Sequence, residues 1–463
     1  MLLPTAAVSR AAALLPALPR AGAAHMVVAP DAAALLLADS ALGATADELA
    51  GSLFGASLFP WLAMLYWLKH PLVKAPSGVS FGLTYLLAFV FGSIPAAIGA
   101  GAMYGVSLAD SDYLHGAAES LLAITNCVVV LGFRAALAPG ASSSTDGTDD
   151  ASTARLRTVA TALGGLAALS AVFVVASGGA SVHVPWLGGI GNLPSSVWAE
   201  EPANALSVPT WIIHTSSLVE WLVAMGLAWR YAEVSGRSEW KGVTWGMLPL
   251  HTSGIVACTY HLFYNAPAIT WCVALQAGMT CVGNTTLAYA CLRLALACGW
   301  TWEAGKADAL ALKDEAMARV GAVLGEEAMG ARAQSAARTD ATDEAAVARA
   351  ADAAPRVSDA AVAVEGDAAT AAAAALVGWE DLGDAWQRDS DVAFLIKLLA
   401  LSGALAYLVK YTPIALFAVG VTEGVPPEVV SALALLVIFV PTGLNVAKWR
   451  QRSKEGSEFV GDF

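Results

Sequence analysis

The sequence predicts an all-α fold: a polytopic membrane helix bundle of about nine transmembrane helices, in two parallel three-helix modules plus a connector helix and a two-helix tail. Composition carries the membrane assignment. Of the 463 residues, 57% are hydrophobic and 14% are charged, whereas an ordinary soluble domain has about 25% charged residues. The mean hydropathy is +0.61, and apolar stretches of roughly 20 residues, the length that spans a bilayer, recur along the chain.

The charge of the chain excludes one class of partner. The 38 Asp and Glu residues exceed the 25 Lys and Arg residues, which gives a net charge of −13. A nucleic-acid-binding protein would show a basic patch, so we expect no nucleic-acid partner, and the lipid bilayer is the expected partner. The 6 cysteines lie in or beside apolar runs without CxxC spacing, which is typical of reduced residues that pack like small hydrophobic side chains.

The chain begins with a segment that we interpret as a targeting sequence. Residues 1–25 contain Arg10 and Arg20, many alanines and no acidic residue, and this composition is typical of an organelle transit peptide. A bacterial-type signal peptide is the alternative, but an internal arginine and several prolines would interrupt its apolar core. Residues 26–50 form an acidic N-terminal segment that precedes the first predicted span.

The predicted spans fall into modules. Spans one to three form a first three-span module at 51–138, and spans five to seven form a second at 208–298. The fourth span, a connector at 158–177, gives both modules the same orientation, and the last two spans form a tail at 391–450. The nine predicted spans are residues 52–68, 80–104, 114–137, 158–177, 208–229, 243–262, 269–293, 393–411 and 429–447.

Four other segments lie outside the membrane by composition. Residues 139–157 are a polar linker, residues 178–207 are a loop, and residues 451–463 are a basic-to-acidic C-terminal tail. Residues 303–390 are rich in alanine and charged side chains, so they are predicted to be a mostly disordered linker without a packed domain. Helix propensity favours a solvated helix within it, around residues 308–332.

The loops alternate between two kinds, and this alternation predicts the orientation. One side, here called the basic side, receives nearly all Lys and Arg of the membrane region, and the other, the acidic side, receives loops at 105–113, 178–207, 263–268 and 412–428 that contain neither. By the positive-inside rule the basic side faces the cytoplasm-like compartment and contains the C-terminus. Lys410 alone lies on the opposite side and is expected to snorkel or pair.

Ionisable side chains gather in the spans, where each costs about 2.5 to 3.5 kcal/mol at a helix centre. In the third span, His115, Glu119 and Asn126 lie within about 40° of one another at 100° per residue and form one polar stripe. Most of the others also lie in the acidic-side half of the bilayer. The candidate intramembrane polar residues are His115, Glu119, Asn126, His214, Glu220, His251, His261, Asn265, Gln276 and Asn284.

Two interpretations of these candidates remain open. Imidazoles and carboxylates in one buried site bind a metal ion, haem, chlorophyll or a quinone, or relay protons. Alternatively, the groups hydrogen-bond helices to one another and have no other role, which is the favoured interpretation for His251. No metal-binding spacing such as HExxH occurs, so neither a catalytic residue nor a particular metal is assigned.

Two groups of motifs resemble known families. The first comprises LSVPTWIIHTSSLVEWLVAMGLAWRYAEVSG from Leu206, WKGVTWGMLPLHTSGIVACTYHLFYNAP from Trp240 and LQAGMTCVGNTTLA from Leu275. This segment, residues 206–296, resembles the hypothetical chloroplast reading frame forty-nine (Ycf) family, a three-span family of cyanobacteria and plastids classed as a domain of unknown function. Residues 51–138, with SLFGASLFPWL, FVFGSIPAAIGA and LADSDYLHGAAESLLAITNCVVVLGFR, resemble a second uncharacterised three-span domain of the same lineages.

The resemblance implies a plastid destination, in agreement with the leader, and makes the basic side the stroma. It implies no established activity. The leading interpretation is a non-enzymatic chloroplast membrane protein, in the thylakoid rather than the inner envelope, that assists the assembly or maintenance of a photosynthetic membrane complex. It would act through helix contacts, with or without a bound pigment or cofactor, and its expected protein partners are subunits of that complex. The alternatives are a cofactor- or metal-binding redox protein or enzyme that uses the intramembrane His and Glu residues, and a small-molecule or ion transporter.

Overall fold

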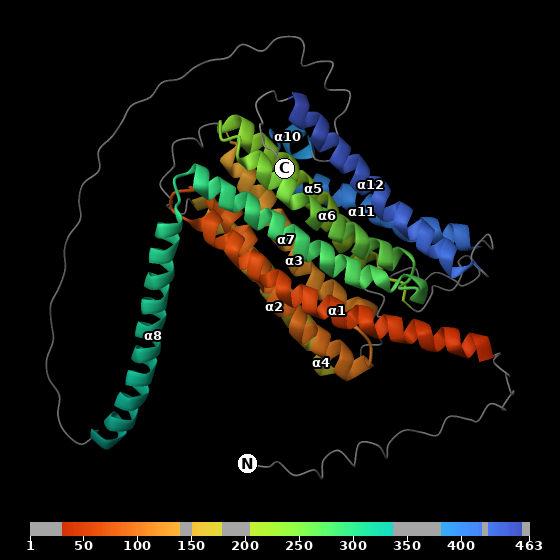
Figure 1. The fold of residues 1–463 in the computed structure, drawn as a ribbon, viewed down its shortest axis with the longest axis horizontal. Coiled ribbons are helices and arrows are strands. Elements are labelled where there is room, and N and C mark those ends of the chain that lie inside the picture. Colours follow the sequence, from red (N-terminus) through yellow and green to blue (C-terminus); the bar gives the residue numbers. More distant parts are fainter. Residues whose placement is uncertain (1–29, 139–150, 178–203, 337–380, 419–424, 456–463) are drawn as a thin grey trace.

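The computed structural model of the protein describes residues 30–138, 151–177, 204–336, 381–418 and 425–455. Every regular element in these ranges is a helix, as the sequence predicts (Figure 1). The predicted transit peptide, residues 1–25, lies outside the described residues, as do residues 139–150 and 178–203 of the predicted linker and loop, 337–380 of the Ala-rich linker and 456–463 of the C-terminal tail. The elements are α1 (Pro30–Lys69), α2 (Ser77–Tyr104), η2 (Leu108–Asp110), α3 (Asp112–Ala136), α4 (Ala151–Ser177), α5 (Val208–Val234), α6 (Trp240–Leu262), η5 (Pro267–Ile269), α7 (Trp271–Ala297), α8 (Trp302–Ala336), α10 (Leu382–Ala385), α11 (Asp391–Ala418) and α12 (Pro427–Glu455).

Each predicted span lies within one of the long helices or extends at most two residues beyond it, but the count of nine spans is not confirmed. Among the described residues, seven helices are long and apolar enough to cross a membrane: α1 from Ala46, α2, α3, α4, α5, α11 and α12. Helix α6 is not apolar enough to count as a membrane span. Helix α7 counts as one only when it is taken together with the start of α8, and the two helices meet at a bend of 109°. The polar side chains of α6 and α7 face their neighbours, as the 2.7 Å hydrogen bond between the Ser253 and Thr280 hydroxyls shows.

Two helices are longer than the predicted segments. Helix α1 continues without a break from Pro30 to Lys69, so most of the predicted acidic N-terminal segment, 26–50, belongs to the first helix. Within the linker predicted to be mostly disordered, Trp302–Ala336 form the single helix α8. Its first turns are anchored to α1, because the Tyr66 hydroxyl donates a 2.6 Å hydrogen bond to Oδ2 of Asp308.

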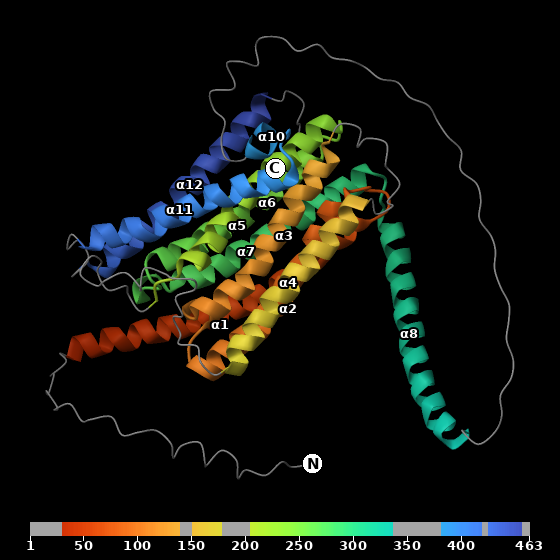
Figure 2. The ribbon, with the colours of Figure 1, turned by 180° about the vertical axis from the view of Figure 1, so that it is seen from behind.

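The helices of the two predicted modules are interleaved. Helix α1 packs mainly along α7 of the second module and makes few contacts with α2, while α3 packs against both α2 and α5. Figure 2 shows α4 lying along α2 and α3, on the far side from α7. Helices α3 and α5 lie at the centre of the bundle. In their apolar stretches, 67% of the residues of α3 and 72% of those of α5 are buried, whereas the buried share is 6% in α2 and 11% in α4. Helices α2 and α4 therefore present their apolar side chains to lipid.

Small residues allow the closest helix contacts. A Cβ atom on Gly132 of α3 would lie 2.6 Å from the backbone carbon of Gly78 in α2. A Cβ atom on Gly283 of α7 would lie 2.8 Å from the backbone nitrogen of Leu250 in α6. Gly283 therefore lets α6 and α7 approach closely. Small-residue contacts of this kind bring membrane helices together.

The end of the Ala-rich linker docks on the bundle. Arg134, which is 4% exposed, donates hydrogen bonds of 3.0 and 2.8 Å to the carbonyl oxygens of Trp386 and Asp389, and its Nε lies 3.3 Å from Oδ1 of Asp391. Its guanidinium also stacks 4.1 Å from the centre of the Phe394 ring. These contacts of Arg134 therefore hold residues 381–390 against the basic end of the bundle.

Lys410 finds a partner at the opposite end of the bundle. It is 4% exposed, and its ammonium group donates a 2.6 Å hydrogen bond to the carbonyl oxygen of Leu206, just before α5. This contact fastens α11 of the tail to α5. The expectation that Lys410 finds a partner is confirmed.

Candidate metal centre

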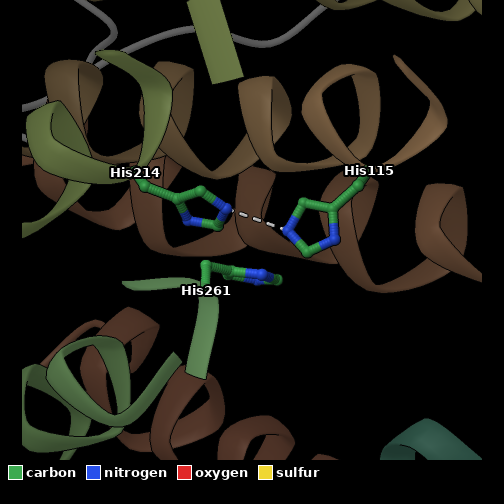
Figure 3. A group of neighbouring side chains, drawn as sticks. All are labelled: His115, His214 and His261. Carbon is green, nitrogen blue, oxygen red and sulfur yellow. Dashed lines mark hydrogen bonds between the residues drawn. The ribbon is translucent and has the colours of Figure 1, made fainter. Parts of the chain in front are cut away.

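Three histidines from three helices converge at the acidic-side end of the bundle. His115 lies in the first turn of α3, His214 near the start of α5, and His261 in the last turn of α6. One ring nitrogen of each lies within 4.8 Å of those of the other two, and the ring centres are 4.8 to 5.0 Å apart. Figure 3 shows the hydrogen-bonded rings of His115 and His214 side by side, with the ring of His261 next to both. We call these residues the histidine cluster.

Helix direction explains the convergence. Helices α3 and α5 begin at the acidic side and α6 ends there, so histidines near those ends lie at one depth. All three side chains are buried, with 8% of His115, 5% of His214 and 3% of His261 exposed. The Nε2 atoms of His115 and His214 are 2.9 Å apart, which is a hydrogen bond between the two rings.

The short helix η2 orients the first ring. Nδ1 of His115 lies 3.3 Å from the carbonyl oxygen of Leu108. A carbonyl oxygen only accepts, so Nδ1 carries the proton and Nε2 presents its lone pair toward the cluster. Fixing one ring nitrogen in this way is how proteins prepare the other nitrogen for a metal ion.

The ring of His261 is oriented by a chain of two residues. Nδ1 of His261 donates to Oδ1 of Asn265 at 3.0 Å, and Nδ2 of Asn265 donates to Oδ1 of Asp110 at 2.7 Å. Asn265 has a positive φ of 56°, a conformation that asparagine adopts more readily than most residues. This backbone turn directs the amide to η2 and leaves Nε2 of His261 as the ligand atom.

A second carboxylate holds the helix starts together. Oδ1 of Asp112, at the start of α3, accepts hydrogen bonds of 3.0 and 3.1 Å from the backbone N–H and hydroxyl of Ser207, the residue that caps α5. Because His115 and His214 lie within two turns of these positions, this contact fixes their spacing. Sequence reasoning treated Asp110 and Asp112 only as acidic loop residues, although both lie in the motif LADSD directly before His115.

The rest of the predicted α3 stripe lies deeper in the bundle. Nδ2 of Asn126 donates to the carbonyl oxygen of Ser217 at 3.2 Å, and the Cys127 thiol donates to Oε1 of Glu220 at 3.2 Å. These contacts join α3 to α5 outside the histidine cluster. Glu119 lies between the two layers, one turn after His115, and has no hydrogen-bond partner among the residues that the structure describes.

Three further candidates do not join the cluster. Nδ2 of Asn445 in α12 lies 3.4 Å from Nδ1 of His251, and Nδ2 of Asn284 donates to the carbonyl oxygen of Ser57 in α1 at 2.9 Å. The backbone carbonyl of Gln276 accepts a 3.0 Å hydrogen bond from the Ser253 hydroxyl. His251, Gln276 and Asn284 therefore connect helices in this structure, away from the histidine cluster.

The cluster is suited to one metal ion. Imidazole is a ligand for Zn, Cu, Fe and Ni, and three protein ligands leave a fourth position open. Tetrahedral zinc with Zn–N distances near 2.1 Å separates its ligand nitrogens by about 3.4 Å, so the three rings, whose nitrogens lie within 4.8 Å of one another, would have to move closer around the ion. A haem or chlorophyll macrocycle needs a slot beside its axial imidazole, whereas His115 and His214 are in direct contact here.

The fold and this site define a helical membrane protein with a buried cluster of three histidines between its helices. Residues 205–293 match a family described as Protein of unknown function (DUF2499), and residues 50–138 match one described as Protein of unknown function (DUF3593). The chain is 49% identical over 87 residues to the Ycf49-like protein of the cyanobacterium Synechocystis, a match that covers 19% of this chain and 84% of the relative. It is 30% identical over 89 residues to the uncharacterized protein ycf49 of Cyanophora paradoxa, covering 19% of this chain and 87% of that protein.

The chain belongs to the Ycf49 family, which confirms the resemblance seen in the sequence, and the family implies a plastid origin. No solved structure matches. The histidine cluster spans both matched segments, because His115 lies within residues 50–138 while His214 and His261 lie within 205–293. Assembly of the site therefore requires that the two domains pack against each other through α3 and α5.

Proposed function

We propose that this chain is a plastid membrane protein that holds one transition-metal ion through His115, His214 and His261. The observation that carries the proposal is the convergence of three ligand nitrogens from three helices within 4.8 Å. Helix contacts alone do not need this arrangement, since one hydrogen bond between two rings would connect two helices. The support around the rings is also of the kind found at metal centres, because η2 holds His115 directly and His261 through Asn265.

Metal analysis of the full chain tests this proposal. The wild-type protein, purified in mild detergent from its own membrane, is expected to contain about one metal ion per chain, and His214→Ala is expected to lose it. His251→Ala is the matched control, because His251 is also a buried histidine, at 9% exposed, but lies outside the cluster. Wild-type protein that neither contains nor takes up Zn²⁺, Mn²⁺, Fe²⁺ or Cu⁺ would contradict the proposal.

The same preparation separates an ion from a coloured cofactor. A redox-active iron or copper centre gives absorption bands that disappear in His214→Ala, whereas a zinc centre is colourless. Haem or chlorophyll would show strong bands between 400 and 700 nm. The contact between the rings favours a spectrum without such bands, and a macrocycle band lost in His115→Ala would contradict the single-ion proposal.

Helix α8 favours a second function, that of an accessory factor for a photosynthetic complex in the thylakoid, with the C-terminus in the stroma. It leaves the basic side of the bundle and extends away from it (Figure 1). Along this helix Leu310, Leu312 and Met317 are 60%, 69% and 64% exposed, and apolar side chains on a solvated helix provide contacts for a partner.

Complementation tests this second function. A strain that lacks the protein is expected to contain less of one photosynthetic complex, and a variant with Leu310, Leu312 and Met317 changed to Ser is expected not to restore it. Lys306→Ala, which changes an exposed residue of the same helix, serves as the control and is expected to restore it. Normal abundance of every photosynthetic complex without the protein would contradict an accessory role.

A further inference from the structure

The metal centre proposed above lacks a negative charge among its ligands. Its three imidazoles are neutral when they bind a metal ion. A divalent ion held by them alone would keep a charge of +2 inside the bundle, and uncompensated charge within a membrane is costly. A carboxylate close to the cluster is therefore expected. Asp110 and Asp112 lie near His115, and a third carboxylate, that of Glu119, belongs to the next turn of α3.

Two of the three carboxylates already have partners. Asp110 accepts hydrogen bonds from the Asn265 amide at 2.7 Å and the Ser107 hydroxyl at 2.8 Å. Asp112 accepts two from Ser207. Through these hydrogen bonds, Asp110 and Asp112 orient the histidine cluster from outside it. Glu119 differs, because in the part of the chain that the structure describes no side chain or backbone group forms a hydrogen bond with its carboxylate.

Glu119 lies one turn farther along α3 than His115, on the inner side of the cluster. Glu119 follows His115 by four positions, so both side chains lie on one face of α3, about 6 Å apart along the helix axis. Side chains on a helix point back toward its N-terminus, and for Glu119 that direction is toward His115. From the middle of the membrane the carboxylate is thus directed toward the rings, although in the structure it lies outside the group formed by the three ring nitrogens.

A thiol occupies the corresponding position on α6. Cys258 lies three residues before His261, and its thiol is close enough to Glu119 for an electrostatic interaction. It packs, however, with the apolar cluster formed by Leu206, Trp211 and Ala406. Of the two groups on the inner side of the cluster, Glu119 is thus the one with free coordinating atoms.

We propose that Glu119 is the fourth ligand of this metal centre. This inference rests on the proposed metal function and deepens it, because it defines the class of ion. A carboxylate oxygen added to three imidazoles favours divalent Zn²⁺, Mn²⁺ or Fe²⁺ over Cu⁺, which prefers soft thiolate and thioether ligands. The carboxylate also lowers the charge of the bound divalent ion, as burial between membrane helices requires.

Metal titration of full-length variants tests the inference. Wild type, Glu119→Gln, Cys258→Ala and Glu220→Gln are titrated with Zn²⁺ against a competing chelator, and Co²⁺ is added to report coordination through its visible spectrum. Glu119→Gln is expected to weaken Zn²⁺ binding at least tenfold and to change the Co²⁺ bands. Cys258→Ala and Glu220→Gln remove a neighbouring thiol and another buried carboxylate, and both are expected to stay within twofold of wild type.

The outcomes separate this inference from the function on which it rests. If wild type binds Zn²⁺, His214→Ala does not, and Glu119→Gln binds as wild type does with unchanged Co²⁺ bands, the fourth ligand is not Glu119 and the three-histidine site stands. If Cys258→Ala weakens binding and Glu119→Gln does not, the thiol replaces Glu119 in that role. If wild type binds none of the ions, both proposals fail. Equal elution volumes and thermal midpoints of the variants show that a loss is not unfolding.

Discussion

Nδ2 of Asn265, in the turn after α6, donates a 2.7 Å hydrogen bond to Oδ1 of Asp110 in η2, and this contact joins the two domains at the edge of the histidine cluster. The same amide accepts from His261 through its oxygen. A loop of the first domain thus controls the orientation of a ligand in the second. The first prediction concerns this connection.

Replacing Asn265 is expected to weaken metal binding without removing a ligand. Loss of an outer hydrogen-bond partner typically lowers metal affinity about 10- to 100-fold. Asn265→Gly keeps the backbone conformation at φ 56°, whereas Asn265→Ala also strains it. Both variants should lose affinity for Zn²⁺ to a similar extent in chelator competition, and only Asn265→Ala should lower the thermal midpoint as well. Unchanged affinity in Asn265→Gly would show that His261 needs no such support.

Arg134 is expected to be essential for docking of residues 381–390. Arg134→Ala leaves the carbonyl oxygens of Trp386 and Asp389 without their donor, and a hydrogen bond from a charged group contributes about 1.5 to 3 kcal/mol. Limited proteolysis should then cleave near Trp386 much faster than in wild type. Arg230→Ala is the control, because its pair with Glu233 is exposed and such pairs contribute little. Equal cleavage rates for the two variants would contradict this assignment.

The contact between Gly132 and Gly78 is expected to tolerate no side chain. In Gly132→Ala the new Cβ would lie 2.5 Å from the backbone nitrogen of Val79, so α2 and α3 must separate, which we expect to lower stability by about 1 to 3 kcal/mol. Gly165→Ala in α4 is the control, because its Cβ would meet nothing within 4 Å. Thermal unfolding in detergent should show a lower midpoint for Gly132→Ala alone. A midpoint equal to that of wild type would mean that α2 and α3 are packed less tightly at Gly132 than the structure shows.

The part of the site that was predictable depends on helix periodicity and direction. At 100° per residue, His115 and Glu119 share a face, and the loop charges give each helix its direction, so His115, His214 and His261 are expected at one depth. Periodicity identifies a face but not the neighbour that it meets. The sequence therefore did not reveal that His251 faces Asn445 of the tail, or that Glu220 meets Cys127.

The arrangement of the modules was not predictable for a related reason. Short loops favour contacts between consecutive helices, yet α1 packs along α7. Asn284 of α7 reaches the carbonyl oxygen of Ser57 in α1, and this polar contact is one reason for the pairing. Likewise, the role of Asp110 depends on the turn at Tyr264 and Asn265, both with positive φ, and nothing in the apolar pattern reports such a turn.

The final prediction concerns the direction of α4, which determines whether the two domains share one orientation. Helix α4 (Ala151–Ser177) is apolar enough to cross the membrane, and Arg155 and Arg157 lie near its start, so its start belongs on the basic side. A protease site inserted after Asp146 should be cut from the stromal face of intact membranes, and one inserted after Ser195 should be cut only after the membranes are opened. A C-terminal tag should behave like the Asp146 site, since Arg450 and Arg452 end the last span. If the sites after Asp146 and Ser195 are cut from the same face, α4 does not cross, and the second domain is inverted relative to the first.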